Sequence, residues 1–498
     1  MSSTSELTTG DSPPPAPAPG GEGDGAPGER RSFISGARIL TIGIASTGIF
    51  TFLYLATASH VLSKGAYSLV SLCWSIMFVI LSVIYRPIEQ LLSRTIADRR
   101  ARGLEGHSLR TPAMIQFSFA VLFLIVALIL RPQIEQGMFN GSSTLYWVLV
   151  VGVLAYAASY FARGWLAGHQ RFALYGGLVF LESTSRFVPA LAVAVGIASG
   201  LGAVAVGMAI APFVSLAVIP FAFTRVTQSA PSPAHAADAA DAAATAEVAG
   251  AEASQEGPAQ AQLEEASTQL SLRNGADFAI SVVGIMLAEQ TLMNAGVLII
   301  AGKTAGGAAT LTAGLTGFVF NVMLIVRAPL QLFQAIQTSI LPHLAGLEAR
   351  EDSTEFHRAI RTTVLVIAAF GLAVALGLLV VGPPVMKVVL GDKGFAYQRI
   401  GLAVVGLGMG LHLVAGTLNQ AALARGRARW AAASWLTAAA LFVIFVVTGP
   451  SQGHAAVNRV EFGYFGATAV LAALLWALYR RGPAPAQPAQ RAPAASAI

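Results

Sequence analysis

Two short loops of this chain repeat one residue pattern, and the repetition decides the interpretation of the fold. They read Gly168-His169-Gln170-Arg171-Phe172-Ala173 and Gly426-Arg427-Ala428-Arg429-Trp430-Ala431. Both follow G-x-x-R-aromatic-A and lie 258 residues apart (426 − 168). A second pair reads Arg86-Pro87-Ile88-Glu89-Gln90-Leu91-Leu92 and Arg327-Ala328-Pro329-Leu330-Gln331-Leu332-Phe333. Repetition of this kind is typical of a chain built from two related halves.

Apolar segments fill both halves. Only 11% of the residues are charged, against about 25% in soluble domains. A run of about 20 apolar residues crosses a bilayer as a helix, which satisfies its own backbone. The sequence therefore predicts an all-α polytopic membrane protein with twelve spans, six on each side of a polar linker. They cover about 38–60, 68–86, 113–130, 145–162, 174–198, 202–223, 277–300, 310–330, 363–386, 399–422, 431–449 and 462–479.

Polar, Pro- and Ala-rich stretches set the predicted domain boundaries. We expect a disordered N-tail at 1–33, an N-terminal lobe at 34–226, a linker at 227–272, a C-terminal lobe at 273–480 and a disordered C-tail at 481–498. Such stretches bury too little apolar surface to offset the entropy of ordering. The central stretch favours a plain tether over a regulatory contact, with transient helix near 260–269. The N-tail has no apolar run, so it is not expected to be a signal peptide.

Basic residues predict the orientation in the membrane. Of 31 Lys and Arg, seven fall on predicted outer loops and two within spans, which leaves 22 (31 − 7 − 2) on the other side. An excess of Lys and Arg marks the cytoplasmic side. We therefore expect both termini in the cytoplasm. Anionic lipid head groups account for the basic surface, so nucleic-acid binding is not expected.

The chain lacks the sequence signatures of an enzyme. No phosphate-cradling Gly-Lys-Ser/Thr loop and no serine hydrolase elbow is present. The single cysteine, Cys73, excludes an internal disulfide or a thiol metal cluster. We predict no catalytic residues, no metal site and no cofactor.

Further motifs give a family resemblance. One motif is the stretch 163–172, followed by Tyr175, Glu182 and Arg186. The others are 87–97, and 327–335 with Leu341-Pro342-His343-Leu344. Together they resemble the polysaccharide-export (Wzx-like) flippases of the multidrug/oligosaccharidyl-lipid/polysaccharide (MOP) superfamily. The resemblance covers about 34–480 without the linker. A high ratio of Arg to Lys is typical of an actinobacterial source.

The resemblance implies two pseudo-symmetric lobes that face each other across a central cavity. It also implies a polyprenyl-diphosphate-linked oligosaccharide as substrate, moved across the inner membrane from the inner to the outer leaflet. Membrane lipids, a polysaccharide polymerase and glycosyltransferases are the other partners expected. A sugar-diphosphate head cannot cross hydrocarbon unaided, because burying unpaired charge is costly.

Ionisable residues within the spans are the candidate site, because charge at that depth is expensive and usually functional. Glu182 and Arg186 share a helix face and form either a structural ion pair or a substrate contact. Arg327, Gln331 and Gln334 form a polar stripe that either lines the cavity or marks where the helix leaves the bilayer. Arg327 could hold phosphate oxygens in a fork. The cavity candidates are Arg186, Arg327, Gln331, Gln334, His412 and Asn419.

Carboxylates are the candidates for ion or proton coupling. The resemblance favours Glu289, and Glu182 is the second candidate; a helix–helix hydrogen bond is the alternative for Glu289. Five arginines near the loops, Arg86, Arg163, Arg171, Arg425 and Arg429, either orient helices through lipid phosphates or meet substrate at the cytoplasmic entrance.

Three other functions remain open. A MATE-like drug or cation antiporter would share the architecture. A lipid II flippase ranks next, and a polytopic glycosyltransferase or polymerase ranks last because the outer loops are too short for a catalytic domain.

Overall fold

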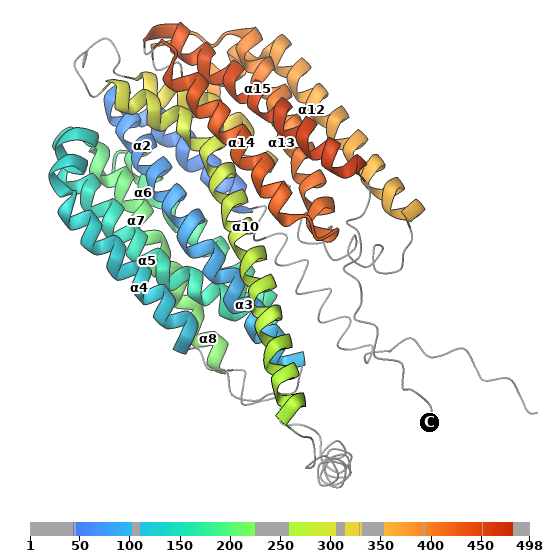
Figure 1. Ribbon diagram of the computed structural model, residues 1–498. Coiled ribbons are helices and arrows are strands. Elements are labelled where there is room, and N and C mark those ends of the chain that lie inside the picture. Colours follow the sequence, from blue (N-terminus) through green and yellow to red (C-terminus); the bar gives the residue numbers. More distant parts are fainter. Residues whose placement is uncertain are drawn as a thin grey trace, which may run out of the picture.

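The computed structural model describes residues 43, 46–101, 110–224, 258–304, 314–327, 329–330, 353–391, 394–450 and 452–481. Helices without strands make up the regular structure of these ranges, and they form two lobes (Figure 1). The N-terminal lobe contains a helix at 46–61, then α2 (Lys64–Ile80), η1 (Leu81–Tyr85), α3 (Arg86–Ala101), α4 (Arg110–Ile129), η2 (Gln133–Met138), α5 (Ser143–Gly168), α6 (Phe172–Ala194), α7 (Gly200–Ser215), η3 (Leu216–Val218) and α8 (Ile219–Thr224). The C-terminal lobe contains α10 (Pro258–Thr304), a helix at Leu315–Arg327, α12 (Ser353–Leu390), α13 (Arg399–Ala424), α14 (Ala428–Val447) and α15 (Gly453–Arg480).

Ten of these helices are long and apolar enough to cross a membrane, and Leu315–Arg327 is a shorter apolar helix. Together with the helix at 46–61 they coincide with the twelve predicted segments, so the chain is an all-α, multi-pass membrane protein. Three helices begin well before their predicted spans. Helix α12 begins at Ser353, ten residues before the predicted start at 363 (363 − 353). Helix α15 begins at Gly453, before the predicted start at 462. Hydropathy did not predict this part of the helix because polar side chains occupy its first two turns. Helix α10 begins at Pro258, within the predicted linker.

Corresponding helices of the two halves are buried to similar degrees. The membrane-spanning windows of α4 and α12 are each 17% buried, whereas those of α5 and α13 are 72% and 67% buried. Helices α4 and α12 therefore present apolar side chains to lipid. Helices α5 and α13 form the centre of each lobe, which is why polar residues on them meet neighbouring helices.

The repeat has a different register from the one that the loop motifs predict. In the first loop the amide nitrogens of Gln170 and Arg171 donate to Ala167 and Leu166; in the second, those of Gly426 and Arg427 donate to Leu423 and Ala422. Structurally equivalent positions are thus 256 residues apart, two fewer than the spacing of the motif letters. The cause is the end of the helix, where the residue after the C-cap adopts a positive φ. Gln170 (φ 56°) and Gly426 (φ 68°) occupy that position, so Gly168 is not the counterpart of Gly426.

Close contacts at two glycines confirm the corrected spacing. A Cβ on Gly152 would meet the main chain of Met208 and Ala209, and a Cβ on Gly408 would meet Tyr464 and Phe465. Each of the three positions in the second set lies 256 residues after its counterpart. These residues of α5–α7 therefore correspond to residues of α13–α15 at one constant spacing.

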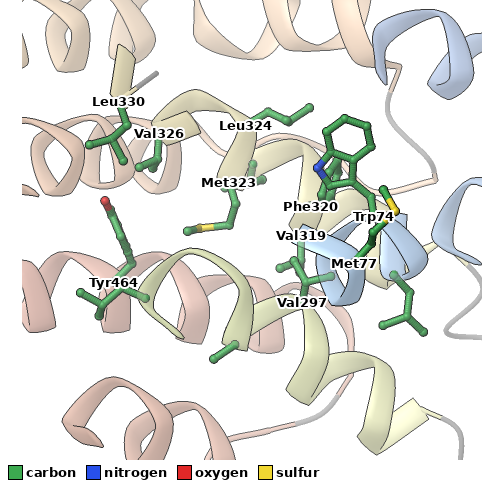
Figure 2. Close-up of a cluster of buried hydrophobic side chains, with 14 of the residues drawn as sticks. Trp74, Met77, Val297, Val319, Phe320, Met323, Leu324, Val326, Leu330 and Tyr464 are labelled. Atoms are coloured by element: carbon green, nitrogen blue, oxygen red, sulfur yellow. The ribbon is translucent and has the colours of Figure 1, made fainter. Parts of the chain in front are cut away.

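The lobes are joined by apolar packing and by hydrogen bonds near Tyr397. Trp74 and Met77 of α2 lie in one buried cluster with Val297 of α10 and Phe320 (Figure 2). Tyr67 donates a hydrogen bond of 2.5 Å to Asn321 Oδ1. Asn321 Nδ2 in turn donates to Leu390 O at 3.2 Å, Tyr397 Oη at 3.3 Å and Ser59 Oγ at 3.5 Å. We call this the Tyr397 end; the opposite end, where α5, α13 and α15 finish, is the arginine-rich end.

Candidate functional site

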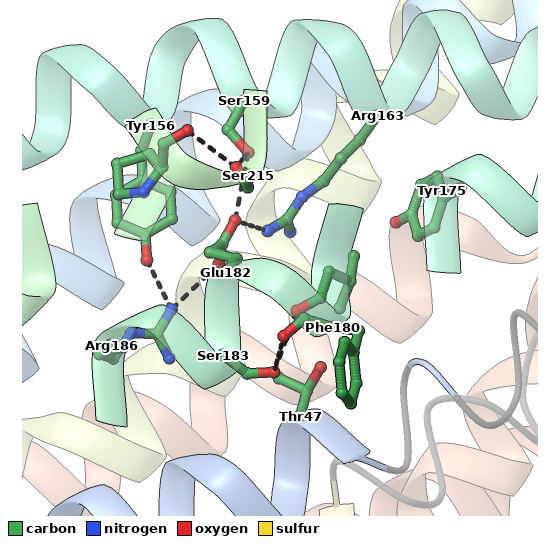
Figure 3. A network of polar contacts seen from close by, with 12 residues as sticks. Thr47, Tyr156, Ser159, Arg163, Tyr175, Phe180, Glu182, Ser183, Arg186 and Ser215 are labelled. Carbon is green, nitrogen blue, oxygen red and sulfur yellow. Dashed lines mark hydrogen bonds and ion pairs between the residues drawn. The ribbon is translucent and has the colours of Figure 1, made fainter. Parts of the chain in front are cut away.

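A carboxylate between two arginines lies inside the N-terminal lobe (Figure 3). Glu182 of α6 accepts a hydrogen bond of 3.0 Å from Arg186, four residues further along the same helix. Its other oxygen accepts from Arg163 of α5 and, at 3.1 Å, from Ser159. The ion pair that the spacing of Glu182 and Arg186 permits is therefore present, and Arg163 joins it.

Arg186 is 2% exposed and makes its polar contacts within the same lobe. It donates to Tyr156 Oη at 2.5 Å and to Thr51 Oγ1 at 3.4 Å. Its guanidinium also lies over the rings of Trp74 and Phe78, 5.1 and 5.5 Å from their centroids. This surrounding packing separates Arg186 from solvent in the described conformation.

A second carboxylate connects α3 to α6 near the arginine-rich end. Glu89 accepts a hydrogen bond of 2.7 Å from Tyr175 Oη. Beside this contact α3 and α5 approach so closely that a Cβ on Gly164 would touch the main chain of Glu89. The family-like motif residues Arg163, Tyr175, Glu182 and Arg186 thus fasten the helices of the N-terminal lobe together.

Arg327 is differently placed, on the face of the C-terminal lobe next to α2. Its guanidinium donates to Asn294 Oδ1 at 2.6 Å and to Met293 O at 3.3 Å, and lies 4.8 Å from the centroid of Phe320. It is half-buried, and Tyr67 of α2 is near enough to act on it electrostatically. Within the described ranges no carboxylate forms a salt bridge with Arg327.

An amide pair on α10 lies behind the contact with Arg327. Asn294 Nδ2 donates to Gln290 Oε1 at 3.1 Å, and the two residues are four apart on one helix face. Gln331 and Gln334 lie outside the described residues. The described part of the stripe therefore consists of Arg327 alone, held by amide and carbonyl oxygens.

Glu289 and Arg86 lie on segments of the two lobes that pack against each other, α10 and the start of α3 beside η1. Both are half-buried, Glu289 on α10 and Arg86 directly after the π-helical turn η1. Arg86 lies near enough to act electrostatically on Glu289. π-helical turns inside long helices often occur at functional positions. These two residues bring opposite charges to the interface between the lobes.

His412 and Asn419 lie inside the C-terminal lobe. His412 Nδ1 forms a hydrogen bond of 2.9 Å with Tyr464 Oη, and its ring meets Trp435 edge-on. Trp435 Nε1 donates to Asn419 Oδ1 at 3.1 Å. By the 256-residue spacing His412 corresponds to Tyr156 and Asn419 to Arg163. A charged network in one lobe is thus matched by a neutral one in the other.

The remaining loop arginines lie at the arginine-rich end. Arg425 donates to Tyr479 O at 3.2 Å, and it satisfies one of the last carbonyls of α15. Arg171 is half-buried beside Trp165, while Arg429 is exposed in the first turn of α14. Arg427, which the sequence motif did not single out, donates to Leu478 O at 2.8 Å.

Glu461 is a buried carboxyl that the sequence prediction missed. It is 2% exposed within α15, whereas the predicted span began only at residue 462. The signal was present, because His454, Asn458 and Glu461 follow one another at helical spacing just before that span. Low local hydropathy concealed the helix that carries them.

Comparisons with known proteins identify the fold. No family model matches the chain, and no curated protein matches its sequence. The Vibrio cholerae MATE transporter VcmN in its bent form matches with a TM-score of 0.52 and 14% identity, over 91% of this chain and 98% of that chain. A multidrug resistance MATE family transporter of the MOP superfamily matches in its outward-facing conformation (TM-score 0.56, 13% identity, 91% and 95% coverage) and in its inward-facing one (0.55, 15%, 89% and 97%). The chain therefore has the two-lobed fold of the MATE transporters of the MOP superfamily.

Proposed function

We propose that this protein is a flippase that moves a polyprenyl-diphosphate-linked oligosaccharide from the inner to the outer leaflet of the bacterial inner membrane by alternating access. The observation that carries the proposal is Arg327. It is a half-buried guanidinium at the lobe interface whose described hydrogen-bond acceptors are neutral oxygens. A planar guanidinium binds two phosphate oxygens at once, which suits a diphosphate.

Alternating access is supported by how the lobes meet. The hydrogen bonds around Asn321 close the Tyr397 end, and they join side chains from both lobes. In transporters with repeated bundles, one bundle rocks against the other around a fixed site. In our proposal the described conformation is closed at the Tyr397 end, which the positive-inside rule assigns to the outside.

The direction of transport depends on that orientation. In a Cys73→Ala background, a cysteine at position 452 is expected to react with an impermeant thiol reagent in intact cells. A cysteine at position 240, in the linker, is expected to react only after the cells are permeabilised. The opposite pattern would reverse the proposed direction and place both termini outside.

Ion coupling is assigned to Glu289 in this proposal. Arg86 of the other lobe acts electrostatically on its carboxyl, so a change of the charge of Glu289 alters the attraction between the lobes. Coupling by Glu182 is less well supported, because that carboxylate already binds Arg163 and Arg186. Collapse of the proton or sodium gradient is expected to stop transport.

A drug or cation antiporter is the second candidate, and Glu289 favours it. A half-buried carboxylate at the lobe interface suits a cationic substrate, and two of the matched structures are of a multidrug resistance transporter. This function predicts that Glu289→Gln, and not Arg327→Lys, abolishes transport of a cationic dye.

The cellular test uses a strain that lacks the gene and carries it on a plasmid. We expect Arg327→Ala to abolish export of surface polysaccharide and to leave lipid-linked precursor in the inner leaflet, at normal levels of membrane-inserted protein. Arg459→Ala is the matched control, because Arg459 stacks on Phe445 at the Tyr397 end. Normal export with Arg327→Ala would remove this residue as the diphosphate contact.

A further inference from the structure

One face of α15 carries a line of polar residues that the proposed function does not use. His454, Asn458, Glu461 and Tyr464 follow one another at intervals of four, three and three residues, so they share one helix face. The line starts in the first turn of α15, at the Tyr397 end. It leads to the hydrogen bond between Tyr464 and His412 in the middle of the lobe.

Glu461 is packed without a counter-ion. Among the described residues its Oε2 has no hydrogen-bond partner, and no salt bridge reaches it. The carboxyl lies against Gly401 of α13, where a Cβ would collide with both of its oxygens. A glycine at position 401 therefore provides the space in which the carboxyl is buried.

The charged groups on the surrounding helices are engaged elsewhere or lie outside this space. Arg459 of α15 donates to Phe445 O at 2.8 Å and stacks on the Phe445 ring. Lys303 of α10 donates to Val446 O and Gly449 O, at 3.1 and 2.9 Å. Arg399 is exposed at the start of α13, and the one ionisable residue of α14, Arg429, lies in its first turn, at the arginine-rich end. Glu289 of α10 acts on Tyr464 rather than on Glu461.

A buried carboxylate with no counter-ion is costly, and such a group becomes neutral by taking up a proton. The neighbouring polar atoms provide a route for that proton. His454 is half-buried at the end of the lobe, and Asn458 Oδ1 is buried without a described partner. Deeper in the lobe, His412 Nε2 is also buried without a described partner. His454 thus places a ring nitrogen at the outer end of the line, one helical turn before Asn458.

We propose that Glu461 is a proton-binding site inside the C-terminal lobe, reached from the Tyr397 end through His454 and Asn458. The step is simple acid–base chemistry: the carboxylate takes a proton from hydronium and leaves water, and the carboxylic acid later returns it. The site has no counterpart in the other lobe, where Ala205 occupies the position 256 residues earlier. Only the coupling of this proton to transport rests on the proposed function; the site itself does not.

Infrared difference spectroscopy of the purified full-length protein in nanodiscs tests the site without transport. We expect a carboxylic-acid C=O band that disappears as the pH is raised and that is missing from Glu461→Gln. Glu135→Gln is the control, since Glu135 is paired with Arg131 at a surface. The same band, with the same pH dependence, in wild type and Glu461→Gln would overturn the proposal.

The route is tested by hydrogen–deuterium exchange of that band. Asn458→Leu is expected to slow the exchange several-fold while the band remains, because it removes the amide between His454 and Glu461. Unchanged exchange would overturn the route through Asn458. If the Glu461 band is found but no lipid is translocated, the proposed function fails and the proton site stands.

Discussion

The two lobes share a fold but treat buried charge in opposite ways. In the N-terminal lobe Glu182 is bound by two arginines, and Arg186 is bound by Tyr156 as well. In the C-terminal lobe the positions 256 residues later than Glu182 and Arg186 are Ala438 and Phe442. Two ionisable side chains inside that lobe, Arg327 and Glu461, have no described ion-pair partner. One copy of the repeat thus uses its buried ionisable groups to hold helices together, whereas the other leaves Arg327 and Glu461 without an ion-pair partner among the described residues.

The largest effect is expected from removing the centre of the N-terminal network. Glu182→Ala leaves Arg163 and Arg186 buried without their carboxylate, which costs about 3–5 kcal/mol of unfolding free energy. Equilibrium unfolding in mixed micelles measures this loss.

The matched control is Glu135→Ala. It breaks an exposed i,i+4 pair with Arg131, which costs about 0–1 kcal/mol. Equal losses for the two variants would mean that the Glu182 network is no more important for stability than a surface pair.

A smaller effect is expected at the contact between lobes. Asn321→Ala removes the acceptor of Tyr67 and the donor to Leu390 O, at about 1 kcal/mol for each hydrogen bond in a membrane protein. The Tyr397 end should open more often, and a cysteine at the buried position 390, whose backbone carbonyl is kept, should react faster with thiol reagents in a Cys73→Ala background. Tyr67→Phe, which removes one of these bonds, should show a weaker acceleration. Slower labelling in Asn321→Ala would contradict a closing role for this contact.

The smallest effect on stability is expected at Glu461. If the carboxyl is protonated, Glu461→Gln replaces one neutral group by another and changes the unfolding free energy by less than about 1 kcal/mol. The comparison is with Glu182→Ala in the same unfolding experiment. A loss as large as that of Glu182→Ala would show that Glu461 is charged and paired, as the carboxylate of the N-terminal network is.

The fold could be predicted from the sequence to a large extent, because membrane-spanning helices leave a strong hydropathy signal. Segments such as 113–130 and 399–422 coincide with α4 and α13 within a few residues. The start of α15 could not be predicted in this way, since His454, Asn458 and Glu461 lower the hydropathy of its first turns. The residue letters reveal the repeat but not the correct alignment of its two copies. The alignment depends on the positive φ at Gln170 and Gly426, and position 170 is a glutamine where such a φ would lead one to expect glycine.

The candidate site was predictable only where partners are close in sequence. The spacing of Glu182 and Arg186 indicates their pair, and that of Gln290 and Asn294 indicates their hydrogen bond. Arg163 joins Glu182 from another helix, 19 residues away in sequence. Likewise, the packing of Glu461 against Gly401 depends on the contact of α13 with α15. Contacts of this kind are set by tertiary packing, which no spacing rule for one helix contains.

The difference between the lobes is tested most directly by translocation in proteoliposomes. The probe is a fluorescent polyprenyl-diphosphate-linked N-acetylglucosamine, whose arrival in the outer leaflet is scored by an impermeant quencher. Loss of a bidentate, charge-assisted contact costs about 1.5–3 kcal/mol, or roughly tenfold to a hundredfold in affinity. We predict that Arg327→Lys reduces translocation by that order, because a lysine cannot reproduce the fork, while Arg459→Lys translocates like wild type. Equal translocation by Arg327→Lys and wild type would contradict the assignment of the diphosphate to the C-terminal lobe.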